Sequence, residues 1–332
     1  MLKLLSLILI TTTAIFFNAC SSKEVYEPKN VVDSWAKAGS SDVTIENIAS
    51  DSALVQERKV LVEGKVLNIK ISDNYKLLGY SDGWVISSNI DGNLTMQSVE
   101  NSAKVESFDL KKTIATASVK DDVLAVLFID NEIALYSIST KSILLKEQGD
   151  TAVVVNSKIV KPYFKDDLIL FSTLDGKVVI INSTLKKKLR TIIVSSENYF
   201  NNIIYFNLVD NKIIAATGHK ILSFSNKEIR AKYDIRSVVD DGKTIFLNTK
   251  QGEVVALTPE LKENAKVKFP FAHFLGMIVT SDKLYVLEKE GYLIEMSKDL
   301  LEYKVYDVDV DDGYIFIDDK IFYVVDEYIS VE

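Results

Sequence analysis

Cysteine, histidine and proline are scarce in this sequence of 332 residues, which contains one, two and four of them, respectively. A single cysteine cannot form a disulfide within the chain, and a zinc site of the usual kind, with three or four His or Cys ligands, lacks donors. After the first twenty residues, no apolar run approaches the roughly 20 residues that a membrane-spanning helix needs. These absences argue against a protein stabilised by disulfides, a zinc-binding protein and a membrane protein with several spanning helices.

Sequence signatures of catalysis are also missing. The chain has no Gly-x-Ser-x-Gly, no phosphate-binding loop and no dinucleotide fingerprint. We expect His219 in a turn and His273, which lies between Phe271 and Phe274, in or near the core. The formal net charge of −8 argues against binding of nucleic acid or of anionic lipid by the protein surface. The residues therefore predict a protein that is not an enzyme and has neither cofactor nor metal.

A β-hairpin recurs along the chain with a period of about 40 residues, which is typical of β-propellers. In each copy a short apolar run stops at a turn and a second apolar run follows. The turns are Asp91-Gly92, Asp130-Asn131, Asp175-Gly176, Gly218-His219, Gln251-Gly252, Glu290-Gly291 and Asp326-Glu327. Two β-rich runs joined by Asp-Gly form the strongest short-range hairpin signal, because the tight turn needs positive φ.

The apolar runs are nearly continuous rather than alternating, as in residues 168–174 and 177–182. Strands that are covered on both faces have this composition, and the blades of a propeller cover one another. A run with interleaved polar residues follows each hairpin, for example residues 189–194, and is expected to be the exposed edge strand.

The final hairpin, residues 321–331, ends without an edge strand, so we expect the N-terminal part to supply it, from residues 59–62 or 66–71. The seven hairpins indicate seven blades, and an eighth is added if residues 77–88 form a further hairpin. The sequence thus predicts an all-β propeller of seven or eight four-stranded blades, closed by an N-terminal strand.

The first twenty residues indicate a lipid anchor. Residues 4–17 carry no charge and have the length of a signal-peptide core. Ala19-Cys20 at their end resembles the lipobox of bacterial lipoproteins, in which the cysteine is acylated; the alternative is an ordinary signal peptide with an incidental cysteine. Residues 1–19 are thus expected to be a signal peptide, residues 20–55 the lipidated N-terminus and tether, and residues 56–332 the propeller. Ser21, in place of an aspartate, favours the outer membrane.

A lipobox followed by hairpins of this form resembles the pyrroloquinoline-quinone-type propeller family, and within it the BamB-like outer-membrane lipoproteins. The segment from Gln251 to Leu257, Gln-Gly-Glu-Val-Val-Ala-Leu, carries the likeness most clearly. The resemblance implies a scaffold that faces the periplasm and binds outer-membrane β-barrel assembly proteins or unfolded outer-membrane clients. The quinone-dependent enzymes of this fold hold their cofactor between a tryptophan and a vicinal disulfide, and a chain with one cysteine cannot build that site.

One loop is a candidate partner-binding site. Tyr199 and Phe200 are aromatic residues in an otherwise polar stretch, residues 195–202, between two strong strands. Exposed aromatic side chains are common interface anchors; the alternative is that both tuck into the junction between blades. In the BamB-like proteins the corresponding loop is implicated in holding the assembly partner, but no residue carries over from it.

Two other functions remain open from the sequence. A membrane-anchored enzyme or small-ligand binder would use the central channel, with acidic residues binding a cation or a basic substrate. A lipoprotein exposed on the cell surface would have an adhesive role.

Overall fold

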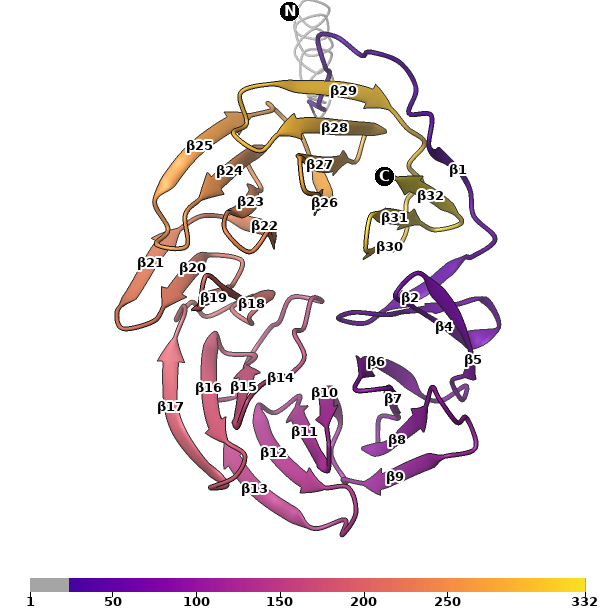
Figure 1. Ribbon diagram of the computed structural model, residues 1–332, viewed down its shortest axis with the longest axis vertical. Helices are drawn as coiled ribbons and strands as arrows, with labels where there is room; N and C mark the ends of the chain where they lie inside the picture. The colour runs from indigo at the N-terminus through magenta and orange to yellow at the C-terminus, as the bar shows by residue number, and fades with distance from the viewer. Residues whose placement is uncertain (1–23, 332) are drawn as a thin grey trace, which may run out of the picture.

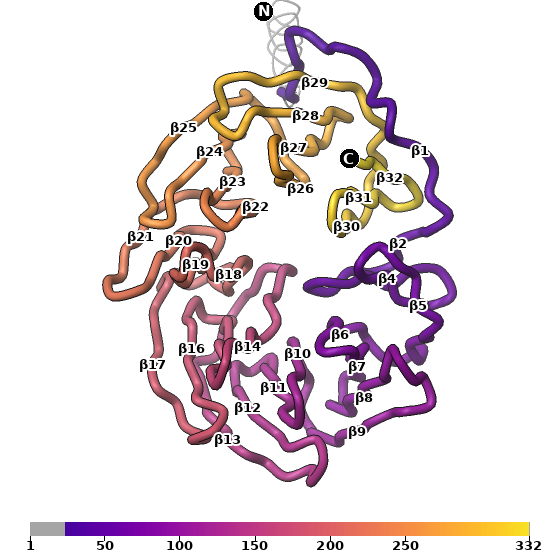
Figure 2. Tube along the Cα trace, viewed as in Figure 1, coloured from indigo at the N-terminus to yellow at the C-terminus, as the bar shows by residue number. Residues whose placement is uncertain are grey.

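The computed structural model describes residues 24–331, which form a ring of eight four-stranded antiparallel blades (Figures 1 and 2). Cys20 lies outside the described residues. Within residues 24–331, no helix has the length and apolarity needed to cross a bilayer. The prediction of an all-β propeller is confirmed, with the higher of the two blade numbers.

The blades are numbered here in chain order, and the strands of each run from the middle of the ring outward (Figure 1). Blade 1 contains β2 (Ile45–Ile48), β3 (Ala53–Val55), β4 (Lys59–Val62) and β5 (Lys65–Lys70), with the short helix η1 (Gln56–Arg58) between β3 and β4. Blade 2 contains β6 (Lys76–Ser81), β7 (Trp84–Ser88), β8 (Asn93–Ser98) and β9 (Val105–Asp109). Blade 3 contains β10 (Ile114–Lys120), β11 (Val123–Phe128), β12 (Glu132–Ser137) and β13 (Ile143–Gln148). Blade 4 contains β14 (Tyr163–Lys165), β15 (Leu168–Ser172), β16 (Lys177–Asn182) and β17 (Lys187–Ile193).

The second half of the ring follows the same plan. Blade 5 contains β18 (Tyr205–Val209), β19 (Lys212–Ala216), β20 (Lys220–Phe224) and β21 (Glu228–Lys232). Blade 6 contains β22 (Ile235–Asp240), β23 (Ile245–Thr249), β24 (Glu253–Leu257) and β25 (Glu263–Lys268). Blade 7 contains β26 (Phe274–Val279), β27 (Lys283–Glu288), β28 (Tyr292–Ser297) and β29 (Tyr303–Asp307). Blade 8 contains β30 (Ile315–Asp318), β31 (Ile321–Val324), β32 (Glu327–Ser330) and, outermost, β1 (Ala38–Ser40).

The core is divided among the interfaces between neighbouring blades. Alternate residues of a strand point to opposite faces of its sheet, so Leu124 and Val126 of β11 pack against blade 2, whereas Ala125 and Leu127 pack against blade 4. This is why the apolar runs are continuous: both faces of the middle strands are buried. The outermost strands, such as β17, are mostly exposed.

The seven predicted turns all connect the second and third strands of a blade. The corresponding turn of blade 1 was not predicted. The short helix η1 takes its place, with Glu57 and Arg58 at positive φ where the other blades have pairs such as Asp-Gly. The prediction that residues 77–88 add a further blade was wrong, since they form β6 and β7 of blade 2.

Closure by an N-terminal strand is confirmed, but the strand is a different one. Ala38, Gly39 and Ser40 of β1 pair with Ile329, Tyr328 and Glu327 of β32. The two segments predicted for this position belong to blade 1 instead. Residues 59–62 form β4, and residues 66–71 lie in β5 and extend one residue beyond it. The propeller therefore begins at Ala38 rather than at residue 56. A strand of three residues is too short to leave a periodic pattern in the sequence.

Residues 24–37 lie along the outer edge of blade 7 before they reach β1 (Figure 1). The backbone N–H of Val32 donates to the carbonyl oxygen of Val305 at 2.8 Å, and that of Asp307 donates to the carbonyl oxygen of Asp33 at 3.0 Å. Tyr26 is buried, with its ring edge-on to that of Tyr292. This part of the expected tether is thus docked on the propeller.

Trp35 fixes the docked segment to the last strand, and its replacement by alanine is expected to destabilise the protein by about 3 kcal/mol. Its indole N–H donates to the carbonyl oxygen of Ser330 at 2.7 Å, and its ring packs against Tyr285 and Tyr306. Urea unfolding at equilibrium measures the loss. Unchanged stability would mean that the N-terminal segment does not hold the ring closed.

Candidate functional site

One face of the ring, which we call the hairpin face, carries the turns between second and third strands together with the connections between blades. Because adjacent strands run in opposite directions, these two kinds of loop lie at the same end of the blades. Backbone hydrogen bonds join them: the N–H of Val194 donates to the carbonyl oxygen of Gly176, and the N–H of Phe269 donates to that of Gly252. Each turn therefore supports the connection that follows its own blade.

Exposed apolar side chains gather on the hairpin face. They are Ile90, Ile129, Val153, Val154, Tyr199, Phe200, Phe271 and Tyr314. The loops of the opposite face, in the described part of the chain, expose Leu185 and Leu301 as large hydrophobic residues. Ten further exposed large hydrophobic residues lie on the outermost strands and in the N-terminal segment, for example Ile143 and Tyr303. Among the loops of residues 24–331, exposed apolar side chains are therefore more frequent on the hairpin face, and such side chains are common in protein interaction sites.

Tyr199 and Phe200 lie in the connection between blades 4 and 5, with 58% and 50% of their surface exposed. The alternative prediction, that they tuck into a blade junction, was wrong. Their backbone is held from both sides: the Phe200 N–H donates to the carbonyl oxygen of Val154 at 2.9 Å, and the His219 ring lies 3.2 Å from the carbonyl oxygen of Tyr199. His219 itself is in the β19–β20 turn, as predicted. The loop thus presents two aromatic side chains from a fixed backbone.

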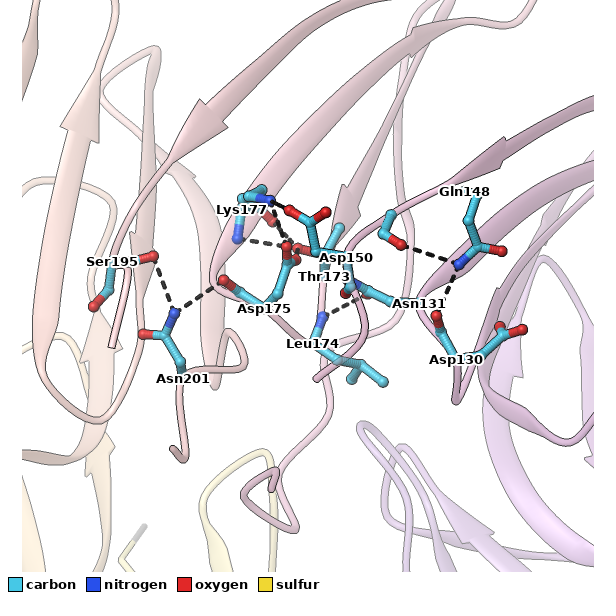
Figure 3. A network of polar contacts seen from close by, with 11 residues as sticks. Asp130, Asn131, Gln148, Asp150, Thr173, Leu174, Asp175, Lys177, Ser195 and Asn201 are labelled. Carbon is cyan, nitrogen blue, oxygen red and sulfur yellow. Dashed lines mark hydrogen bonds and ion pairs between the residues drawn. The ribbon is translucent and has the colours of Figure 1, made fainter. Parts of the chain in front are cut away.

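A network of buried amides fixes this region of the hairpin face (Figure 3). The amide nitrogen of Asn201 donates to the carbonyl oxygens of Asp175 and Ser195, at 2.9 and 3.0 Å. Asn131, also buried, accepts from the Leu174 N–H and donates to the carbonyl oxygen of Asp150. These contacts connect the turns of blades 3 and 4 with the Tyr199–Phe200 loop. A surface that is ordered before binding loses less entropy when a partner binds.

The pocket beside this network is small. It has a volume of about 150 Å³ and is lined by residues that include Asn131, Asp150, Asp175 and Lys177. Sites for small organic molecules usually have volumes of roughly 300 Å³ or more. The pocket beside the amide network is therefore too small to enclose such a molecule. A second hollow on the hairpin face, at Ile90, Lys112 and Ile129, has a volume of about 400 Å³.

The connection between blades 3 and 4, residues 149–162, runs inward to the middle of the ring (Figure 2). Lys161 reaches blades 1 and 2 on the other side: its ammonium forms an ion pair with Asp51 and donates to the carbonyl oxygen of Tyr80 at 2.7 Å. Ile159 and Val160 pack into the interfaces on either side of blade 4. We call residues 158–161 the channel segment.

The channel segment carries two basic residues, Lys158 and Lys161, and the inner strand β22 contains Arg236. Of the acidic residues considered for the channel in the ligand-binding alternative, Asp51 lies here and pairs with Lys161. His273, expected in or near the core, is in contact with Arg236. No group of three or more metal-ligating side chains forms in residues 24–331. Sequence reasoning missed the ion pair of Asp51 and Lys161 because the two residues are distant in the chain and belong to different repeats.

Comparison with known proteins gives sequence relatives and structural neighbours. No family model matches the chain. Plasminogen-binding protein PgbB of Helicobacter pylori J99 is 36% identical over 195 residues, which cover 58% of this chain and 36% of PgbB. PgbB of strain 26695 is 35% identical over the same length. The chain thus spans about a third of the length of the curated relatives that it matches, and these relatives are named for a binding activity.

The structural neighbours share the propeller fold at low sequence identity. BamB from Moraxella catarrhalis superposes with a TM-score of 0.68 at 11% identity, covering 89% of this chain and 98% of that one. The computationally designed Ika8 protein gives 0.61 at 13% identity, with coverage of 91% and 99%. The chain has a BamB-like β-propeller fold.

Proposed function

We propose that this protein is a lipid-anchored scaffold without enzymatic activity, which binds a partner protein through the hairpin face. The observation that carries the proposal is the pair of exposed aromatic side chains on that face, Tyr199 and Phe200, whose loop is held by the buried amide of Asn201. Large aromatic residues held on an ordered backbone are typical binding hot spots.

The anchor follows from Cys20, with the outer membrane favoured by Ser21. Two or more acyl chains hold a protein durably to a bilayer. Glu24, four residues after Cys20, is the first described residue, and the chain from there is docked beside blade 7. At about 3.5 Å per residue, the anchor would hold the edge of blade 7 close to the lipid. The hairpin face would then remain accessible to partners.

The first candidate partner is the outer-membrane β-barrel assembly machinery, or its unfolded clients, with the protein on the periplasmic side. The BamB-like fold and the lipobox-like sequence support this choice. Affinity purification of the tagged protein from mildly solubilised membranes, followed by mass spectrometry, tests it. Stoichiometric recovery of the barrel-assembly protein is expected; recovery of the scaffold alone would contradict it.

A second candidate is an adhesive protein on the cell surface, and the identity with the plasminogen-binding protein favours it. Proteolysis of intact cells separates the two. Cleavage by an added protease, together with saturable binding of purified plasminogen, would support the surface role. Protection in intact cells and cleavage only after the outer membrane is opened would support the periplasmic one.

A further inference from the structure

The N-terminal segment crosses the outer edge of blade 7 between two aromatic anchor points (Figure 1). Tyr26 is buried in the interface between blades 6 and 7, where its ring lies edge-on to that of Phe269, with 5.9 Å between the ring centroids. Trp35 packs into the interface between blades 7 and 8. Between these points, a parallel bridge joins Ser34 to Asp307 of β29. The chain from Tyr26 to Trp35 is therefore held as the outermost layer of this blade.

Exposed apolar side chains are more numerous in this layer than at the outer edge of any other blade within residues 24–331. Four of them, from the N-terminal segment and β29, are between 40% and 58% exposed: Val25, Val31, Val32 and Tyr303. The outermost strand of any other blade exposes at most two large hydrophobic residues, as β17 does with Leu189 and Ile193. We call the four residues the blade 7 edge patch.

The lipid anchor of the proposed function would enter beside this patch. Tyr26 is six residues after Cys20, and six residues reach at most about 21 Å. That reach is shorter than the diameter of roughly 50 Å expected for a compact chain of this size. Acyl chains on Cys20 would therefore hold the edge of blade 7, rather than the far side of the ring, at the bilayer.

The charges of the segment indicate which lipid surface the patch fits. Residues 24–33 carry three exposed carboxylates, of Glu24, Glu27 and Asp33, and one exposed ammonium, of Lys29. This balance gives no attraction to anionic lipid, which is drawn to clusters of Lys and Arg. Contact with a bilayer must then come from the burial of apolar area. A zwitterionic phospholipid surface meets this requirement.

We propose that the blade 7 edge patch rests directly on a phospholipid surface. The inference depends on the lipid anchor of the proposed function but not on which partner the hairpin face binds. Apolar side chains that enter the interface add to the affinity of the acyl chains, and a tyrosine suits this position because its ring is apolar and its hydroxyl stays hydrated. Since the patch lies on the rim of the ring, the propeller would stand on its edge, with the hairpin face at right angles to the bilayer.

Partitioning into vesicles tests the proposal with an anchor that is supplied chemically. The chain from Cys20 to Glu332 is purified, and its single thiol is coupled to a maleimide that carries one myristoyl chain. One such chain alone binds membranes only marginally, so a contribution from the patch becomes measurable. With vesicles of phosphatidylcholine and phosphatidylethanolamine, serine at Val25, Val31 and Val32 is expected to lower the partition constant about tenfold, because less apolar area is buried.

The matched control removes three exposed apolar side chains from the edge of blade 4, by Leu185→Ser, Leu189→Ser and Ile193→Ser. This variant should partition as the parent does. Both triple variants replace exposed side chains and should unfold at nearly the parent's urea concentration. The proposal is overturned if the valine variant partitions like the parent, or if the control loses as much affinity.

Hydroxyl-radical footprinting of the coupled protein gives a second, independent measurement. Oxidation of Tyr303 is expected to fall about threefold or more when vesicles are added, because lipid covers its ring, whereas oxidation of Tyr199 and Phe200 should not change. Equal decreases at both places would mean that the ring has no preferred orientation, and would contradict the proposal. Mass spectrometry of Cys20 from cell membranes is a separate test: an unmodified thiol would contradict the anchor of the proposed function, while the vesicle results would still decide whether the patch binds lipid.

Discussion

Replacing Tyr199 by serine and Phe200 by asparagine is expected to lower the affinity for the partner protein by about 100-fold or more. Truncation of a hot-spot aromatic residue costs about 2 kcal/mol or more, and each 1.4 kcal/mol corresponds to roughly tenfold in affinity. Asparagine is chosen at position 200 because it tolerates the φ of +52° found there. Binding of the purified variant to the partner, measured by surface plasmon resonance, gives the loss.

The matched control is the pair Leu185→Ser and Leu301→Ser, which removes exposed apolar side chains from the opposite face. Both double variants should unfold at nearly the parent's denaturant concentration, because exposed side chains contribute little to stability. The expected pattern is loss of binding in the first variant and parental binding in the second. If the leucine variant lost affinity and the aromatic variant kept it, the interaction surface would be the opposite face.

Gly176→Ala is expected to destabilise the protein by about 3 kcal/mol and also to weaken partner binding. Gly176 has φ of +83°, and an added Cβ would lie 2.7 Å from the carbonyl oxygen of Ser195 and 2.8 Å from that of Asn201. Backbone strain and overpacking each cost roughly 1–3 kcal/mol. Since Asn201 follows Phe200 directly, the displacement would reach the aromatic loop. Equilibrium unfolding in urea and the binding assay above measure the two effects.

Two other glycines separate the effects. Gly252→Ala has a comparable clash, with the carbonyl oxygen of Phe269, but lies two blades away from the aromatic loop. It should lose similar stability and keep its affinity. Gly83→Ala has φ of +75° but no atom within 4 Å of the added carbon, so about 1 kcal/mol is expected. Equal losses in all three would indicate that backbone strain alone sets the cost.

The repeating part of this fold could be predicted from the sequence because each blade carries the same local signal. A glycine or asparagine at positive φ, as at Gly176 and Asn131, is required by a tight turn and is visible in a single hairpin. Blade 1 was missed because Glu57 and Arg58 adopt positive φ, although neither residue type favours that conformation. Tertiary contacts stabilise this turn: the Arg58 side chain donates to the carbonyl oxygens of Ser72 and Ile71.

The candidate sites could be predicted only in part. Tyr199 and Phe200 stand out because aromatic residues are unusual in a polar loop, whereas their exposure depends on Asn201 and Asn202, which hold the backbone. By contrast, the inward course of residues 149–162 and the place of Lys161 between blades 1 and 2 could not be predicted. No local pattern encodes that course, because it is set by contacts with Asp51 and Tyr80 on distant blades.

The first and the last strand of residues 24–331 meet in blade 8, and this imposes an order on maturation. β1 lies in the N-terminal part of the propeller, whereas its partner β32 follows the strands of the seven other blades. A chain that emerges from a ribosome or a translocation pore therefore cannot complete the ring until β32 is free. Until then, the faces of blade 8 stay uncovered, and exposed apolar strands are prone to aggregate. The protein should depend on chaperones most strongly just before β32 emerges, and a truncation that removes β32 should be degraded rather than accumulate as a shorter propeller.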